Sequence, residues 1–141
     1  MTKPLLYIDT NVYIDCAKNR NDYLRPLGEF AFQLLRRIGG CEFDVVISDL
    51  LIKELEKILS VDEIFEMLNK YDQLKKVHRV ESSFADKEFA RIISRERKTS
   101  YSDTLHSILA RKAGAIVLVT RNSKDFFVLS DIMKIKLPES V

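Results

Sequence analysis

The sequence predicts a three-layer α/β/α sandwich with a mostly parallel central sheet, and three observations support this fold class. Short, continuously apolar segments alternate with longer segments whose apolar residues recur at helical spacing. Within each short segment, apolar and polar residues do not alternate, which is typical of strands covered on both faces. The chain of 141 residues contains no internal repeat and no Pro/Gly-rich linker. We therefore expect a single domain over residues 1–141.

Strands are predicted where apolar residues follow one another without a break. The first covers residues 4–9, contains Leu5 to Ile8 and ends at Asp9. The others are expected at 43–47, 77–80 and 116–120, with one further candidate at 134–137. Their shortness and lack of alternation favour parallel strands between two layers of helices.

Helices are predicted between the strands, where apolar residues share one face. The first runs from Leu27 to a stop at Gly39-Gly40, and another is expected over 49–59. Three serines are placed to begin further helices: Ser60, Ser83 and Ser102. These helices are expected over 61–70, 83–97 and 103–113. On the second of them, four side chains are expected to be buried: Phe84, Phe89, Ile92 and Ile93.

Composition and charge narrow the classes of protein. Apolar residues make up 46% of the chain, which is enough for one packed core. No apolar run approaches the roughly 20 residues of a membrane helix, and we expect a cytoplasmic protein. The net charge of +2 is too small to indicate nucleic-acid binding by itself. Cys16 and Cys41 lie far apart and predict neither a disulfide nor a zinc site.

Four acidic residues fall near the carboxyl ends of the predicted strands, where proteins with open parallel sheets bind their ligands. Asp9 ends the first strand, and Glu54 lies in the helix after the second. Asp103 opens the helix before the fourth strand, and Asp125 follows that strand. We therefore expect these elements to bring four carboxylates to one edge of the sheet.

Clustered carboxylates without basic partners repel one another unless a cation lies among them. Oxygen ligands favour hard ions, so the expected cofactor is Mg²⁺ or Mn²⁺, as one or two ions. Carboxylates that hold such ions are the usual apparatus for the attack of water on a phosphodiester. The candidate chemistry is therefore metal-dependent hydrolysis of a phosphodiester.

Each of the four acids also has an ordinary structural interpretation. Asp9 would suit the turn after a strand, and Asp103 would suit the first turn of a helix. Glu54 would suit a solvated helix face beside a lysine, and Asp125 would suit a surface loop. Spacing alone does not join the four. Other acids are equally available to an argument from composition: Asp15, Asp44, Asp49 and Asp131.

Three stretches together resemble a known family. They are YIDTNVYID, ISDLLIKELEKI and SDTLHSILARKAGAIVLVTRNSKDF. In order and spacing they are similar to the PIN-domain ribonucleases and, among these, to the VapC-like toxins. The resemblance spans residues 5–127 and is most specific in its last stretch. It implies a PIN-like fold and an endoribonuclease that depends on a divalent metal.

The resemblance also implies roles for individual residues. It identifies four acids as catalytic residues and metal ligands: Asp9, Glu54, Asp103 and Asp125. It identifies four neighbours that orient those acids through hydrogen bonds: Thr10, Asn11, Thr120 and Asn122. Many family members have an acid at the position of Asn122. This chain therefore has one negative charge fewer for a second metal ion.

Basic residues are candidates for contacts with RNA. Arg121 and Lys124 lie beside the acids after the fourth strand and are candidates for phosphate contacts, although a strand-end arginine is as often a surface charge. Two basic stretches, LKKVHR and RIISRERK, are equally typical of solvated surfaces. His106 lies one helical turn after Asp103, and a surface or helix-packing role is favoured for it over a place in the site.

Three functions remain to be compared. The leading one is a metal-dependent endoribonuclease, and RNA as its substrate follows from the resemblance alone. The alternative is a catalytically inactive PIN-like scaffold that binds RNA or protein, which Asn122 favours. A receiver-like domain would place a second acid after the first strand, but Thr10 and Asn11 occupy those positions.

The resemblance to VapC-like toxins also implies partners. It implies an antitoxin protein that covers the acidic groove, and it implies a homodimer. The apolar sides of the helices over 22–38 and 49–70 are candidates for a partner face. The same apolar sides would form plain core in a monomer.

Overall fold

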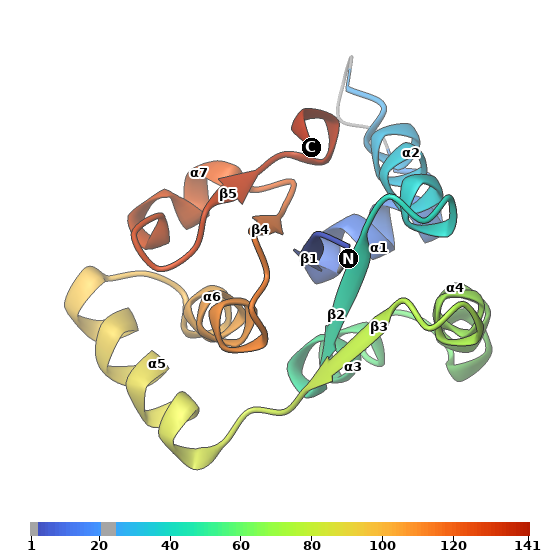
Figure 1. Cartoon of the computed structure of the whole chain (residues 1–141). Coiled ribbons are helices and arrows are strands. Elements are labelled where there is room, and N and C mark those ends of the chain that lie inside the picture. Colours follow the sequence, from blue (N-terminus) through green and yellow to red (C-terminus); the bar gives the residue numbers. More distant parts are fainter. Residues whose placement is uncertain (1–2, 21–24) are drawn as a thin grey trace.

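Five parallel strands form the central sheet in the computed structural model, which describes residues 3–20 and 25–141. In chain order they are β1 (Leu5–Ile8), β2 (Asp44–Ser48), β3 (Val77–Val80), β4 (Val117–Val119) and β5 (Ile135–Lys136). They lie side by side in the order β3-β2-β1-β4-β5, and each neighbouring pair is parallel. The five predicted strands and the α/β/α fold class are confirmed (Figure 1).

Helices cover both faces of this sheet. They are α1 (Thr10–Lys18), α2 (Leu27–Gly39), α3 (Asp49–Leu55), α4 (Val61–Gln73), α5 (Phe84–Arg97), α6 (Tyr101–Ala113) and α7 (Ser123–Phe126). Two short 3-10 helices follow, η1 (Phe127–Leu129) and η2 (Pro138–Ser140). The core residues of α1 to α4 pack on one face of the sheet and those of α5 to α7 on the other (Figure 1). Within the described residues, no helix has the length and apolarity to cross a membrane.

The core is divided in two because successive strand residues point to opposite faces of the sheet. On β1, Leu6 and Ile8 pack against α1 to α4, whereas Tyr7 packs against α5 and α6. On β2, Val45 packs on the face covered by α1 to α4, and Val46 packs on the opposite face. All five side chains have no exposed surface. Burial on both faces explains why the strands are continuously apolar in sequence.

The starts of the helices agree with the sequence in most places. The capping box of Ser60 and Glu63 is present at the start of α4, and Ser83 caps α5. The predicted start of α6 is wrong, because Ser100, rather than Ser102, accepts the hydrogen bond from the N–H of Asp103. The sequence did not predict α1, which begins directly after β1, and α3 ends four residues before its predicted end.

Burial on α5 differs from the prediction. Ile93 is buried, but Phe84, Phe89 and Ile92 are 79%, 55% and 53% exposed. The cause is that α5 packs mainly on α6 instead of on the sheet, so only a narrow stripe of its surface is covered. Helical periodicity identifies an apolar side, but it does not show how much of that side a neighbour covers.

The two predicted partner faces also differ from each other. On α2, the apolar stripe is core: Ala31, Leu34, Leu35 and Ile38 are buried. The beginning of the predicted range 22–38 lies outside the described residues. On α4, by contrast, Val61 and Phe65 are 78% and 63% exposed. Of the two predicted partner faces, the one on α4 leaves large apolar side chains exposed.

Candidate metal centre

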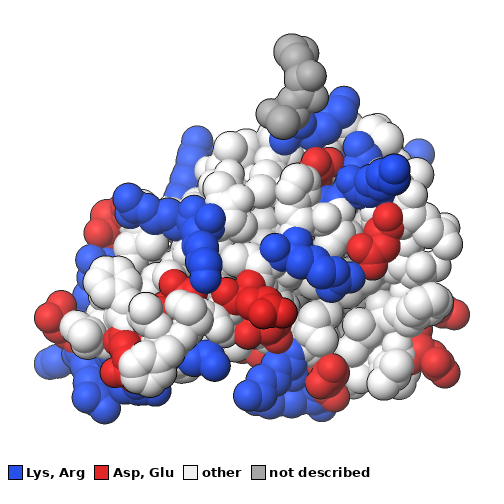
Figure 2. Space-filling model, turned by 60° about the horizontal axis from the view of Figure 1, so that its bottom comes forward, with Lys and Arg blue, Asp and Glu red and all other residues white. Residues whose placement is uncertain are grey.

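Three of the four predicted acids meet in one hollow at the carboxyl edge of the sheet. The hollow has a volume of about 360 Å³ and is lined by Asp9 after β1, Glu54 on α3 and Asp103 on α6. Figure 2 turns the molecule so that the bottom of Figure 1 comes forward. Acidic side chains gather on this face, and Lys and Arg side chains surround them. We call this space the acidic hollow.

The fourth acid, Asp125, lies outside the acidic hollow. It is exposed on α7 and lines a neighbouring hollow of about 340 Å³, which we call the second hollow. Its charge still contributes to the raised pKa of Asp103, after burial and the charge of Asp9. Asp125 is therefore near the other acids but does not share their hollow.

Asp9 is held by hydrogen bonds to both carboxylate oxygens. It caps α1, and its Oδ1 accepts the backbone N–H of Thr10 at 2.7 Å. Its Oδ2 accepts the hydroxyl of Thr120 at 2.9 Å, and the amide of Asn11 donates to the same hydroxyl oxygen at 3.2 Å. The backbone N–H of Asn122 also donates to that oxygen, at 3.1 Å. The structure thus places the predicted orienting residues around Asp9.

Glu54 accepts three hydrogen bonds from side chains. Thr10 donates to its Oε1 at 2.6 Å, Ser102 donates to its Oε2 at 2.5 Å, and His106 Nε2 lies 2.6 Å from Oε1. Burial raises the pKa of Glu54, but these bonds and the charge of His106 outweigh burial and bring the pKa to about 2. Glu54 is therefore a carboxylate at neutral pH.

His106 lies inside the site, so the predicted surface or packing role is wrong. It is 1% exposed, and its Nε2 lies 3.6 Å from Asp9 Oδ1 as well as beside Glu54. Its Nδ1 shares a 2.6 Å hydrogen bond with the hydroxyl of Tyr7, which also bonds Ser48 at 2.7 Å. Because a carboxylate only accepts, Nε2 carries the proton toward Glu54.

The surroundings of Asp103 are the opposite of those of Glu54. Among residues 3–20 and 25–141, no side chain forms a hydrogen bond or ion pair with its carboxylate. Burial and the carboxylate of Asp9 raise the pKa of Asp103 to about 6. Asp103 is the acid of this hollow that most lacks a positive neighbour.

These residues fit a divalent cation. One carboxylate oxygen each of Asp9 and Glu54 and one nitrogen of His106 lie within 4.8 Å of one another. Because His106 Nε2 carries a proton toward Glu54 and Nδ1 bonds Tyr7, the carboxylates are the candidate ligands. Asp103 adds a further carboxylate to the same hollow. Within the described residues, none of these three carboxylates forms an ion pair with Lys or Arg, so a cation among them would offset their mutual repulsion. Carboxylate ligands favour Mg²⁺ and Mn²⁺.

Arg121 and Lys124, the predicted RNA contacts, border these hollows, but the two basic stretches do not. Arg121 lines both hollows, and Lys124 lines the second. In the stretch LKKVHR, Lys76 and His78 pair with Asp44 at the start of β2. In the other stretch, Arg97 pairs with Asp131 and Arg91 pairs with Glu88. Much of the charge of these stretches is therefore used within the fold.

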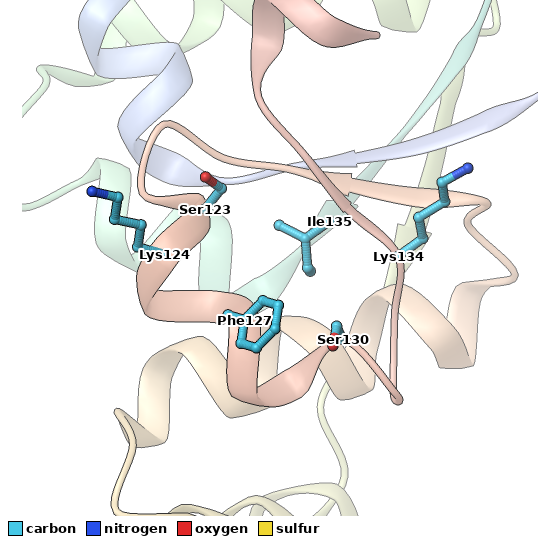
Figure 3. A pocket seen from close by; sticks show the side chains of 6 residues that line it. All are labelled: Ser123, Lys124, Phe127, Ser130, Lys134 and Ile135. Carbon is cyan, nitrogen blue, oxygen red and sulfur yellow. The ribbon is translucent and has the colours of Figure 1, made fainter.

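A wider hollow of about 640 Å³ lies on another side of α7 (Figure 3). Phe127 and Ile135 point into it, whereas Lys124 points away from it. The residues that line it include two lysines and no acid. Its chemistry does not resemble that of the acidic hollow, and volume alone does not identify the site.

The chain was compared with known proteins. Residues 6–130 match the family model of the PIN domain. This match covers most of the chain, and the protein therefore belongs to the PIN domain family. The resemblance seen in the sequence is confirmed. No curated protein matches the chain.

Two solved structures share the fold. One is a toxin-antitoxin complex from Klebsiella pneumoniae, with 22% identity and a TM-score of 0.61 over 94% of this chain and 97% of that chain. The other is VapBC2 from Rickettsia felis bound to a DNA fragment from its promoter, with 18% identity and a TM-score of 0.57 over 94% and 98%. At these identities the likeness establishes the fold.

Proposed function

We propose that this protein is a metal-dependent endoribonuclease that hydrolyses RNA phosphodiester bonds, and that it is the toxin of a toxin-antitoxin pair. The observation that carries the proposal is the convergence of Asp9, Glu54 and Asp103 in one open hollow of a PIN domain. The Klebsiella pneumoniae neighbour, a toxin-antitoxin complex, supports the second part. The cytoplasmic location expected from the sequence stays a prediction.

In this proposal Asp9, Glu54 and Asp103 hold Mg²⁺ or Mn²⁺, as one or two ions. The bound ion supplies a water of lowered pKa and neutralises charge on the phosphate. Thr120 and the N–H of Thr10 fix the direction of Asp9, while the hydroxyls of Thr10 and Ser102 fix Glu54. Asp125 stays a predicted ligand and catalytic residue.

Positive side chains around the acids would attract the RNA backbone. Arg20, Lys57 and Arg121 line the acidic hollow together with the carboxylates. Because the hollow is open at the surface, the positive charge of these side chains can attract the RNA backbone from solution. Phosphate contacts of this kind do not depend on base sequence, and they weaken as salt increases.

The test is cleavage of a mixed RNA pool by purified protein with Mn²⁺, with Mg²⁺ or with EDTA. We expect cleavage with metal and none with EDTA. Asp9→Asn should lower the rate by at least roughly 100-fold, because the amide keeps the shape of Asp9 but loses its charge. The control is Asp62→Asn, which removes an exposed carboxylate from the first turn of α4.

The contrary result is equally informative. Folded wild-type protein, free of bound partner, would show no cleavage with any of these metals. That outcome would contradict the nuclease and favour the inactive scaffold that binds RNA or protein. Asn122 would then be the residue to explain, because it borders both hollows where other family members have an acid.

We propose that the antitoxin binds an apolar groove between α3 and α4. The groove has a volume of about 250 Å³, and its apolar lining is Ile52, Val61, Ile64, Phe65 and Leu68. Ile58, which is 49% exposed, lines the acidic hollow and follows α3 in the chain. A partner in the groove therefore lies close to the acids. Loss of antitoxin binding in Phe65→Ser, with cleavage unchanged, is the expected observation.

We also propose a homodimer, as the sequence suggests. Three large apolar side chains on α5 face solvent in the single chain: Phe84, Phe89 and Ile92. A second copy would remove this surface from water, and burial of such side chains favours association. The molar mass in solution, measured by light scattering, is the observable, and a monomer at all concentrations would contradict the proposal.

A further inference from the structure

A buried ion pair lies beside the acidic hollow, and the metal centre does not explain it. Asp15 on α1 is 2% exposed, and its Oδ2 lies 3.1 Å from Nε of Arg121. The pair lacks the alignment of a hydrogen bond, and within the described residues Oδ1 of Asp15 has no hydrogen-bond partner. Burial of a charge with so few partners is unfavourable for the fold. The pair therefore suggests a role beyond packing.

Asp15 pairs with Arg121, which lines both the acidic hollow and the second hollow. Burial raises the pKa of Asp15, while the charges of Arg121, Arg20 and Arg25 act to lower it. Arg20 and Arg121 line the acidic hollow, and Arg25 and Arg121 line the second hollow. One buried carboxylate thus faces three arginines that border the two spaces.

Arg121 is held at both its main chain and its side chain. Its backbone N–H donates to Asn11 Oδ1 at 3.3 Å, and Asn11 in turn donates to Thr120, which bonds Asp9. Its Nε faces Asp15. In the described part of the chain, no hydrogen bond involves the two terminal nitrogens of Arg121. Its position is thus tied to that of Asp9, and its donors are left for a ligand.

The second hollow is basic, unlike its neighbour. It is lined by three cations, Arg25, Arg121 and Lys124, and by one acid, Asp125. Arg25 pairs with Glu139 at 3.1 Å and Arg121 pairs with Asp15 through Nε, so Lys124 and the terminal nitrogens of Arg121 are the donors considered for a ligand. The two hollows have similar volumes, about 340 and 360 Å³, and share Arg121 and Asn122. An RNA strand carries one phosphate per nucleotide. Because the two hollows share Arg121 and Asn122, a strand with its reacting phosphate in the acidic hollow can extend its adjacent phosphate into the second hollow.

We propose that the second hollow binds the phosphate adjacent to the scissile one on single-stranded RNA, through Arg121 and Lys124, and that Asp15 is the positioning residue that holds Arg121 there. This inference rests on the proposed ribonuclease function. A guanidinium suits the task because its planar set of donors matches two phosphate oxygens. Asp15 restricts the rotation of that side chain before RNA arrives, which lowers the entropy lost on binding.

The first test is binding of a fluorescently labelled single-stranded RNA, measured by anisotropy with Ca²⁺ in place of Mg²⁺ and with a gel to confirm that the RNA stays intact. Arg121→Gln should weaken binding about tenfold and lower the slope of log affinity against log salt by about 0.7, which corresponds to one lost phosphate contact on a single strand. Lys124→Gln should give the same change of slope. The control Lys87→Gln removes an exposed lysine from α5 and should change neither quantity.

The second test concerns Asp15. Asp15→Asn should raise KM roughly fivefold to tenfold for RNA cleavage with kcat within about twofold, because it loosens a substrate contact and leaves the metal ligands in place. In the Arg121→Gln background the same change should have no further effect on KM. Independent effects of the two changes on KM would show that Asp15 does not act through Arg121 and would overturn its assigned role.

The outcomes separate this inference from the function on which it rests. A wild-type protein that cleaves RNA while Arg121→Gln and Lys124→Gln bind like Lys87→Gln would overturn the second hollow alone. That result would assign the basic hollow to an acidic protein segment instead. A wild-type protein that neither binds nor cleaves RNA would overturn the function. Arg121 and Lys124 reach the surface, so these two variants serve even where Asp15→Asn does not fold.

Discussion

Glu54 and Asp103 face the same hollow, yet the fold treats them in opposite ways. Glu54 accepts hydrogen bonds from Thr10, Ser102 and His106, and its pKa falls to about 2. The carboxylate of Asp103 has no such donor in the described residues, and burial beside Asp9 raises its pKa to about 6. One carboxylate is stabilised in its charged form, and the other is destabilised.

The difference shows which part of the site the protein organises by itself. The Glu54 side is held in place by hydrogen bonds that exist without any ligand. The Asp103 side depends on a positive charge from outside, because its like-charged neighbours make the ionised form unfavourable. A cation that binds the folded state would offset that unfavourable term and stabilise the protein. Such local instability is common where function has priority over stability.

The largest effects should come from neutralising each of these acids. Glu54→Gln and Asp103→Asn should both lower RNA cleavage by at least roughly 100-fold, because each removes a charged ligand. In EDTA their stabilities should move in opposite directions. Glu54→Gln should lose about 2 kcal/mol, because its donors lose a charged acceptor. Asp103→Asn should gain about 1 kcal/mol near neutral pH, a figure reduced for the solvent exposure of this side chain.

Urea unfolding of the two variants measures this opposition directly. The control is Glu56→Gln, which changes an exposed glutamate just after α3 and should leave both activity and stability unchanged. If Glu54→Gln and Asp103→Asn were both destabilised to the same extent, the two sides of the hollow would be equivalent. The contrast drawn from their hydrogen bonds would then be wrong.

The sequence was informative wherever the signal is local. An apolar run that ends on Asp9 identifies a buried strand and a polar group at its tip, because both features lie within a few residues. The capping box at Ser60 and Glu63 is local in the same sense. These signals, joined by the resemblance to one family, were sufficient for the fold and for the hollow that contains Asp9, Glu54 and Asp103.

The remaining parts of the site depend on contacts between distant segments. His106 and Glu54 are 52 residues apart, and Ser102 and Glu54 are 48 apart. The core residues of α3 and α6 pack on opposite faces of the sheet, and only at its carboxyl edge do these side chains meet. No spacing in the sequence therefore identifies them as a unit. The one available signal was that His106 follows Asp103 by three residues, which places both on one face of a helix. The place of Asp125 also depends on tertiary structure. It lies on α7 and lines the second hollow instead of the acidic hollow.

A second, intermediate effect should appear in the pH dependence of stability. The folded-state pKa of Asp103 is about 6 and its ordinary value is 3.8, so the folded protein binds this proton more tightly than the unfolded chain does. Its contribution to stability is therefore full below about pH 4 and is lost as the pH rises through about 6. The loss in EDTA should be about 1–2 kcal/mol after allowance for solvent.

Three comparisons isolate Asp103 in that measurement. Asp103→Asn should remove the part of the loss that Asp103 causes, and saturating Mn²⁺ should also remove that part by stabilising the charged form. Burial also raises the pKa of Asp15, which contributes a loss of the same sign that remains in Asp103→Asn. Glu54, with a folded pKa of about 2 against an ordinary value of 4.5, adds stability as the pH rises to about 4.5, so its contribution has the opposite sign to that of Asp103. The carboxylates around His106 raise its pKa against the effect of burial, so its own contribution is lost at higher pH. A loss between about pH 4 and 6 that is as large in Asp103→Asn as in the wild type would assign the effect to another group.

The smallest effect concerns Tyr7, whose hydroxyl bonds the ring of His106, which in turn bonds Glu54. Tyr7→Phe removes hydrogen bonds to Ser48 and His106 and should lower stability by about 1 kcal/mol. Tyr71→Phe is a matched control, because among the described residues its buried hydroxyl donates only to the backbone oxygen of Leu35, at 3.0 Å. The two variants should lose similar stability in urea.

Their activities should differ. Tyr7→Phe should slow RNA cleavage several-fold, because the ring of His106 loses the bond that fixes its orientation toward Glu54. Tyr71→Phe, which lies in the other half of the core, should leave the rate unchanged. Equal rates for both variants would mean that Glu54 needs only its direct donors, and that the ordered side of the hollow extends no further than Thr10, Ser102 and His106.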